Sequence, residues 1–170
     1  FLDENPHEVL LLTFQLQDNV SLDAVYQSLQ TAGLAQNLYV HDPSLSSWPT
    51  LQSLITEHQK RVVLFHYNGE NHCNDVVDPS TPACPSGMHY WYQYGVNTQF
   101  QFDSLTDLQN DDYACQLMAT PGVEQSTRDF FMLNLFLTIP SQVQSADLIN
   151  TLTFAREQMT KCSNLWGGMG

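Results

Sequence analysis

The stretch FLDENPHEVLLLTF, residues 1–14, decides the fold class of this chain. It runs from a polar, helix-like segment through Pro6 into an apolar run at residues 9–14, and a mostly polar stretch follows at residues 15–19. A continuous apolar run between such boundaries is typical of a strand that is buried on both faces, as in a parallel sheet covered by helices. We therefore expect residues 9–14 to form an inner strand that has a partner strand on each side.

Two further apolar runs and one aromatic segment predict more strands. Residues 61–65 (RVVLF) and 129–137 (DFFMLNLFL) are runs of the same kind. In residues 88–102 (MHYWYQYGVNTQFQF), aromatic side chains alternate with other residues, which predicts extended structure that breaks near Gly95.

Segments with helical periodicity lie between these predicted strands. Ser21 is positioned to cap a helix that Gly33 ends, and Ser47 to cap a second helix with Pro49 in its first turn. Ser145 is positioned to cap a third helix. The apolar stripe of this third helix comprises Leu148, Leu152, Ala155 and Met159.

Buried strands that alternate with amphipathic helices predict an α/β protein with a mainly parallel sheet. A closed (β/α) barrel needs roughly 250 residues and eight strands, so about three or four strands favour a partial TIM-type barrel. An open doubly wound sheet is the alternative, but no Gly-rich phosphate loop follows any predicted strand. No repeat or linker divides the chain, and we expect residues 1–170 to form a single domain segment.

The charge balance excludes two classes of partner. The chain has 18 acidic and 5 basic residues, a formal net charge of -13 and a pI near 4.4. Nucleic acids and anionic membranes are bound by clustered Lys and Arg, and this chain has no such cluster. It also has no apolar run of about 18 residues, so we expect no transmembrane segment.

The four cysteines predict an oxidising compartment. Cys73 and Cys84 bound a Pro-rich loop, where a disulfide bond would restrain the insertion and leave Cys115 to pair with Cys162. Four buried free thiols are the alternative. A glycosylation sequon at Asn19 and a low Lys content also favour a secreted, extracellular protein.

In a parallel barrel, the side chains that act on a substrate lie just past the carboxyl ends of the strands. Lys60, Arg61 and Arg128 precede predicted strands, so we expect them at the opposite, stabilising end. The polar candidates that follow predicted strands are Gln15, Gln17, Asp18, His66, Tyr67, Asn68, Glu70, His72, Asp103 and Thr138.

His66 and His72 are candidates for acid and base, because imidazole titrates near neutrality, although solvated loop histidines are the alternative. No metal site is expected, since both conceivable sets have simpler explanations. A zinc set would place a ligand His directly beside a ligand Cys, and a calcium set has the alternative of a solvated acidic loop. The zinc set is His72, Cys73, Cys84 and His89, and the calcium set is Glu70, Asp75 and Asp78.

The order of motifs along the chain carries a resemblance to a known family. FLDENPHEVLLLTF is followed by AGL, WPTLQSLITEHQKRVVLF, a Cys-bounded loop, DFFMLNLFL and finally CSNLWG. Over nearly the whole chain, this series resembles the secreted phosphatidylinositol-specific phospholipase C-like phosphodiesterases. The resemblance implies a distorted α/β barrel in which an upstream histidine pair, with an Arg and carboxylates, cleaves a phosphodiester through attack by a neighbouring inositol hydroxyl.

The resemblance also implies where this sequence departs from the family. Both histidines would precede Phe1, so that the chain starts about three strands into a barrel, and a final strand would follow CSNLWG. Where calcium-dependent members carry a Glu ligand, this sequence has Gln15 or Gln17, and an amide brings no charge. No cofactor is expected, and calcium stays an open alternative. Asn134 matches a strand Asn that lines the cleft, or is a buried amide satisfied by its neighbours.

We therefore expect part of a secreted phosphodiesterase for phosphoinositide-type or other phosphodiester substrates. The segment itself lacks the catalytic histidines, and its partner is the missing remainder of its own barrel. The alternatives are a non-catalytic extracellular structural or binding protein on the same barrel, and an intact small α/β binding domain.

Overall fold

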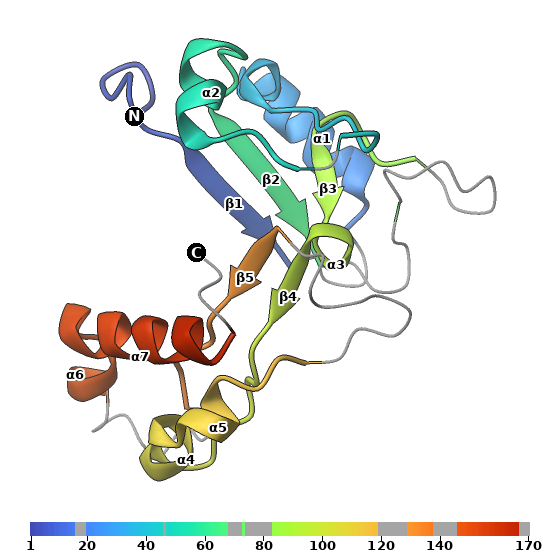
Figure 1. Cartoon of the computed structure of the whole chain (residues 1–170). Helices are drawn as coiled ribbons and strands as arrows, with labels where there is room; N and C mark the ends of the chain where they lie inside the picture. Colours follow the sequence, from blue (N-terminus) through green and yellow to red (C-terminus); the bar gives the residue numbers. More distant parts are fainter. Residues whose placement is uncertain are drawn as a thin grey trace. The chain divides into compact units, whose positions relative to one another are not determined.

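The computed structural model describes residues 1–15, 20–45, 47–67, 73, 83–118, 129–137 and 146–166. The chain divides into two compact units, Phe1–Tyr94 (unit 1) and Gly95–Gly170 (unit 2), and each is described by itself. Both units combine helices with parallel strands (Figure 1), so the predicted α/β class is confirmed. No helix in the described ranges is long and apolar enough to cross a membrane.

Unit 1 is built around a three-stranded parallel sheet of order β1-β2-β3, whose strands lie side by side in Figure 1. The central strand β2 is buried along its whole length, as its apolar run predicted. The elements of unit 1 are β1 (Leu10–Phe14), α1 (Leu22–Thr31), η1 (Ala35–Asn37), α2 (Leu51–Thr56), β2 (Val62–His66), β3 (Met88–Tyr90) and α3 (Trp91–Tyr94).

The expectation that residues 9–14 form a strand buried on both faces is wrong. Within the described ranges β1 pairs with β2 alone, and its burial alternates along the strand. Leu10 and Leu12 pack against the core, whereas the Leu11 side chain on the other face is 54% exposed. A continuous apolar run does not distinguish an inner strand from an outer one, because that difference depends on which segments pair with it.

Helix α1 forms as predicted. The Ser21 hydroxyl accepts a hydrogen bond from the backbone N–H of Ala24, and Gly33 adopts a φ of 71° just past the helix end. A residue with positive φ is the usual way to end a helix, and glycine adopts it without steric cost.

Helix α2 begins later than predicted. Thr50, not Ser47, caps it by accepting a hydrogen bond from the N–H of Ser53, and the helix ends at Thr56. Pro49 disfavours helical geometry in the residue before it, so the helix starts only beyond the proline. Arg61, which precedes β2 as expected, donates hydrogen bonds to the carbonyl oxygens of Leu2 and Asn5 and so anchors the amino-terminal turns.

The predicted break in residues 88–102 is a helical turn, α3, which separates β3 from β4 and ends just before Gly95. Unit 2 pairs β4 with β5 in parallel, and its small core contains Phe102, Leu108, Ala114 and Ile149. Its elements are β4 (Gly95–Asn97), α4 (Leu105–Gln109), α5 (Asp111–Ala114), β5 (Phe130–Met132), α6 (Ala146–Ile149) and α7 (Leu152–Leu165).

The carboxyl-terminal helix turns a different face inward from the one predicted. It is interrupted between α6 and α7, and Thr151 caps α7 through the N–H of Phe154. Met159 of the predicted stripe is 60% exposed, while Gln158 and Cys162 are buried. The disulfide bond from Cys162 to Cys115 holds the Cys162 face of α7 against the unit. Leu148 and Leu152, also of that stripe, are exposed as well. The predicted cap Ser145 lies outside the described residues.

Candidate functional site at the carboxyl ends of the strands

The parallel register of unit 1 brings three strand ends into one row. Phe14 of β1 is aligned with His66 of β2, and His66 is aligned with Tyr90 of β3. The N–H of Tyr67 donates to the carbonyl of Phe14 at 2.9 Å, which extends the pairing of β1 and β2 by one residue. Because side chains alternate along a strand, these three side chains belong to the same face of the sheet.

That face is covered by helix α1 and by a disulfide bond. Leu22 and Leu29 of α1 belong to one core cluster with Leu64, Met88 and Cys73. His66 is fully buried, and its Nε2 atom lies 3.1 Å from Cys73 Sγ and 3.6 Å from Cys84 Sγ.

The structure contains both disulfide bonds that the sequence favoured. Cys73 is bonded to Cys84 with a Cα–Cα distance of 4.7 Å, and Cys115 is bonded to Cys162 with a distance of 5.0 Å. A disulfide sulfur carries no hydrogen, so the contact with His66 is a hydrogen bond only when Nε2 carries the proton. In the tautomer whose Nε2 carries the proton, His66 therefore donates to the disulfide sulfur.

Aromatic side chains surround the strand ends of unit 1. The rings of His66 and Tyr90 are 5.5 Å apart, those of Tyr90 and Tyr92 are 5.7 Å apart, and Tyr67 lies 5.6 Å from Trp91. Burial raises the pKa of the Tyr92 hydroxyl. Burial, and secondarily the charge of Tyr92, raises the pKa of Tyr90. Both phenols are therefore neutral hydrogen-bonding groups at physiological pH.

The opposite face of the sheet packs against an aromatic cluster that the sequence analysis missed. We define this aromatic cluster as Tyr39, His41, Trp48, Phe65, His89, Trp91 and Tyr94. His41 stacks on Trp48 at 4.3 Å, and His89 makes a 3.0 Å hydrogen bond with the carbonyl of Tyr39. The high content of Trp, Tyr and His in residues 39–48 and 88–94 is the sequence pattern that could have predicted this cluster.

The conceivable zinc set is not brought together. The two sulfur atoms are bonded to each other, and His89 lies on the opposite face of the sheet from His66. His72 lies outside the described residues. Among the residues that the structure describes, one group has three metal-ligand side chains within reach of each other, namely His66, Cys73 and Cys84.

Calcium does not fit the described residues. Gln15, which follows β1, is exposed, and its amide brings no charge to a hard cation. The part of the chain that the structure describes groups no set of carboxylates at a strand end. We therefore derive no calcium-dependent step. Asp103 is also exposed. The remaining candidates lie outside the described residues: Gln17, Asp18, Asn19, Asn68, Glu70, Asp75, Asp78, Arg128 and Thr138.

Asn134 in unit 2 links two segments rather than standing alone. Its backbone N–H donates to Thr98 Oγ1, and its Nδ2 donates to the Thr98 carbonyl, both at 2.9 Å. Thr98 is fully buried just past β4. This geometry agrees with the alternative of an amide satisfied by its neighbours, and a role in a cleft stays a prediction.

Unit 2 also has an apolar groove of about 570 Å³ between α7 and the segment that begins with β5. Trp166 stacks on Phe131 at 5.2 Å at this groove. Ala155 and Met159, which the sequence assigned to a buried stripe, line it. The other side chains of its lining include Leu133, Leu135 and Ser163.

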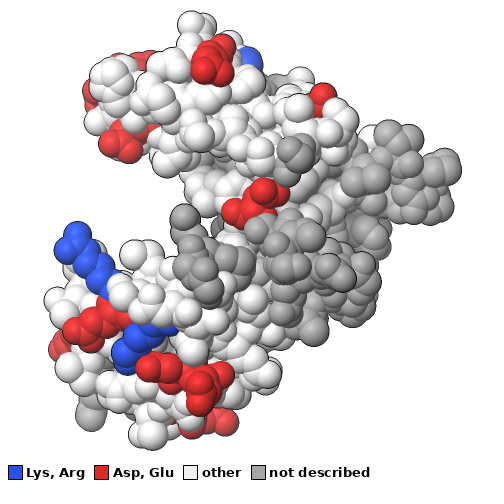
Figure 2. Space-filling model, in the orientation of Figure 1, with Lys and Arg blue, Asp and Glu red and all other residues white. Residues whose placement is uncertain are grey.

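The surface of both units carries acidic side chains, as Figure 2 shows, in keeping with the net charge of -13. A family model described as PI-PLC X 1 matches residues 1–167. No curated protein and no solved structure matches the chain.

Proposed function

Since the chain belongs to the PI-PLC X 1 family, we propose that it forms part of a secreted phosphoric diester hydrolase that acts on phosphoinositide-type substrates. The observation that carries this proposal is the family match over residues 1–167, which spans both units. The parallel strands are compatible with it, because parallel barrels place their chemistry at the carboxyl ends of such strands.

Cleavage of a phosphodiester by a neighbouring hydroxyl needs a base, an acid and a cation near phosphorus. The described residues supply the parallel strands on which such groups could be mounted, but their His and Arg side chains at these strands are engaged elsewhere. His66 lies beneath a disulfide bond and His89 lies in the aromatic cluster. Arg61 is at the amino end of β2, where it binds backbone carbonyls. Because the family resemblance implies a histidine pair upstream of Phe1, we propose that the catalytic histidine pair is supplied from outside these 170 residues.

We also propose that residues 1–170 form one domain segment of a partial (β/α) barrel, and that the protein is secreted. Two disulfide bonds are compatible with an oxidising compartment, where such bonds persist. A glycan on Asn19 would belong to the same setting.

The test is a comparison of two samples. The natural polypeptide that carries this sequence is purified from its source, and the 170-residue chain is produced separately with both disulfide bonds formed. Each is assayed for release of water-soluble inositol phosphate from phosphatidylinositol vesicles. We expect turnover by the natural polypeptide and none by the 170-residue chain.

Each remaining outcome contradicts a defined part of the proposal. Turnover by the 170-residue chain would show that the catalytic groups lie within it. A natural polypeptide that is folded but inactive would favour a non-catalytic extracellular binding or structural protein. Its intact mass after deglycosylation would show whether it is longer than the 19.3 kDa of this chain.

A further inference from the structure

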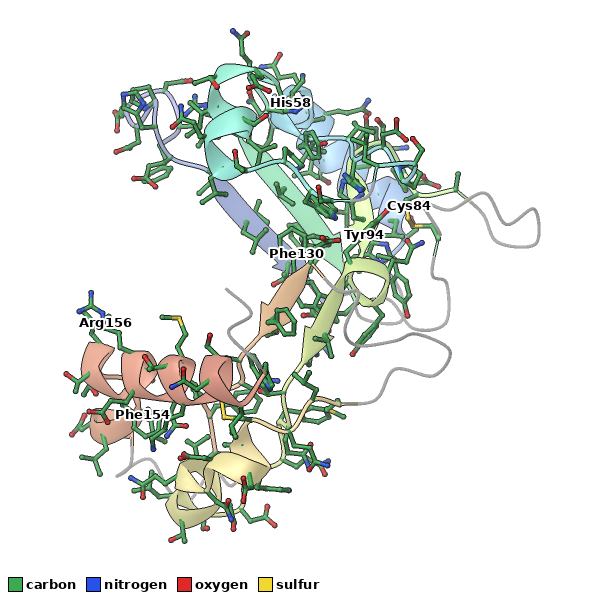
Figure 3. The ribbon with its side chains drawn as sticks, in the orientation of Figure 1. His58, Cys84, Tyr94, Phe130, Phe154 and Arg156 are labelled. Atoms are coloured by element: carbon green, nitrogen blue, oxygen red, sulfur yellow. A yellow bond between two sulfur atoms is a disulfide. The ribbon has the colours of Figure 1, made fainter. Side chains whose placement is uncertain are left out.

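The His66–disulfide cluster, which comprises His66, Cys73 and Cys84, brings an imidazole ring next to a disulfide bond. Its three ligand atoms lie within 4.8 Å of one another (Figure 3, where Cys84 is labelled). The Cys73–Cys84 bond closes a short loop of sequence separation 11, and its sulfur atoms share the core cluster of unit 1. The proposed phosphodiester cleavage does not involve this disulfide bond.

The two sulfur atoms are not equivalent. Cys73 is 3% exposed and His66 is fully buried, whereas Cys84 is only partly buried. His66 Nε2 is also nearer to Cys73 Sγ, at 3.1 Å, than to Cys84 Sγ, at 3.6 Å. An incoming thiolate therefore has its better access at Cys84, and the sulfur that would leave is the one next to the histidine.

We propose that Cys73–Cys84 is an exchange-reactive disulfide bond that small thiols open at Cys84, with His66 stabilising Cys73 as the leaving thiolate. Rates of thiol–disulfide exchange rise when the leaving thiolate is stabilised and when the attacked sulfur is accessible. The N–H of His66 makes a hydrogen bond to the departing charge, and such a charge-assisted bond is stronger than the bond to the neutral disulfide.

The chemistry balances with a monothiol as the reductant. One thiolate forms a new S–S bond with Cys84, the Cys73–Cys84 bond breaks, and its electron pair goes to Cys73 Sγ. A second thiolate then attacks the sulfur of the bound thiol, so that Cys84 leaves in turn. The net result is one small-molecule disulfide and two protein thiolates, which take protons from water, with two electrons passed from the small thiols to the protein.

The Cys115–Cys162 bond provides an internal comparison in the same molecule. Both of its residues are buried, Cys115 with 3% and Cys162 with no exposure. It also closes a longer loop, of sequence separation 47. We expect it to open at least about tenfold more slowly than Cys73–Cys84 under native conditions.

The first test uses reduced glutathione on the natural polypeptide that carries this sequence, with samples quenched by iodoacetamide and mapped by peptide mass spectrometry. We expect glutathione on Cys84 and carbamidomethyl on Cys73 in the first intermediate. Glutathione on Cys73, or equal opening rates for the two disulfide bonds, would overturn the proposal.

The second test isolates His66. His66→Phe keeps a ring in the buried site but removes the N–H donor, and His66→Gln retains a donor on a smaller side chain. We expect opening of Cys73–Cys84 to slow by about tenfold in His66→Phe, with partial recovery in His66→Gln. The opening rate of Cys115–Cys162 and the far-ultraviolet circular dichroism serve as folding controls.

An unchanged rate in a correctly folded His66→Phe chain would exclude the assisting role of the histidine. If neither variant folds, the position of glutathione in the unmodified protein still decides the direction of attack. Because no phosphodiester assay enters either test, the result is independent of the proposed hydrolase function.

Discussion

Asn134 connects two backbone segments of unit 2 with a single side chain. Its amide donates to the carbonyl of Thr98, while its backbone N–H donates to the Thr98 hydroxyl. The pair continues the β4–β5 pairing, in which Thr98 N–H also donates to the carbonyl of Met132. A donor is required at the Asn134 side chain, and this requirement can be tested by substitution.

We expect Asn134→Ala to lower the free energy of unfolding by about 1 kcal/mol, because one hydrogen bond is lost. Asn134→Asp is expected to cost more, about 2 kcal/mol, since a carboxylate cannot donate and faces a carbonyl oxygen. Urea unfolding followed by tryptophan fluorescence measures both. Asn150→Asp adds the same charge at an exposed position and is expected to change stability by less than about 0.5 kcal/mol. Equal effects at Asn134 and Asn150 would contradict the structure.

Tyr90 and Tyr92 make stability depend on pH in the alkaline range. Burial raises both folded-state pKa values, so the folded state retains phenol protons that the unfolded chain has lost. The stabilisation from these groups is complete below the unfolded value of about 10 and is lost as pH rises through the folded-state pKa.

We therefore expect the urea midpoint of the unmodified protein to fall more steeply above pH 10 than that of a Tyr90→Phe, Tyr92→Phe double variant. Absorbance at 295 nm reports tyrosinate directly. The folded protein should show less tyrosinate at a given alkaline pH than the same protein in urea. Coincident titration curves would contradict the burial of these side chains.

At the scale of elements, two glycines with positive φ have different tasks. Gly33 ends α1 with a φ of 71°, and nothing lies within 4 Å of the position of an added Cβ. Gly87 precedes β3 with a φ of 79°, and an added Cβ would lie 2.7 Å from the Cβ of Leu38. The first glycine serves backbone conformation alone, whereas the second also permits close packing.

Gly33→Ala and Gly87→Ala form a matched pair for this difference. Both place alanine in a left-handed conformation, at a cost of about 1–2 kcal/mol. Gly87→Ala adds a clash with buried Leu38, which is expected to cost about 1–3 kcal/mol more. The difference between the two urea unfolding free energies measures the packing term. A Gly87→Ala variant as stable as Gly33→Ala would contradict the close approach.

Helices and strands were predictable from the sequence where local residue patterns alone specify them. The apolar run of β2 and the Ser21 cap of α1 needed no distant partner to be recognised. The start of α2 at Leu51, with Thr50 as its cap, was missed because Pro49 restricts the residue before it. The buried face of α7 was missed because the disulfide bond at Cys162, and not the apolar stripe, holds that face against the unit.

At the scale of the whole molecule, each unit contains one disulfide bond. A longer loop loses more entropy in the cross-linked unfolded chain. For the sequence separations of 11 and 47, the expected stabilisation is about 3 and about 4 kcal/mol, respectively.

We expect Cys115→Ala, Cys162→Ala to destabilise the chain by about 1 kcal/mol more than Cys73→Ala, Cys84→Ala. If residues 1–170 are one domain segment, each pair of substitutions should shift the same cooperative transition in urea. Circular dichroism and tryptophan fluorescence both monitor it. Two separate transitions, each sensitive to only one disulfide bond, would contradict the single-domain proposal.

The net charge of -13 also acts at the scale of the molecule. Anionic surfaces repel such a chain over a distance of roughly 10 Å at 0.1 M salt. We expect negligible sedimentation of the 170-residue chain with phosphatidylinositol vesicles at low salt, and no more than with neutral phosphatidylcholine vesicles. Binding to the anionic vesicles that weakens as salt is added would contradict this expectation.

The sequence alone predicted the α/β class, the burial of the β2 strand and the cap and end of α1, and it favoured the two disulfide bonds Cys73–Cys84 and Cys115–Cys162 over four free thiols. These features depend on short-range patterns and on loop geometry, which the order of residues specifies. The tertiary structure alone decided that His66 lies beneath a disulfide bond, that His89 faces the aromatic cluster and that Asn134 binds Thr98. The physical reason is that strand register and helix phase set which side chains meet, and both depend on segments far apart in the chain.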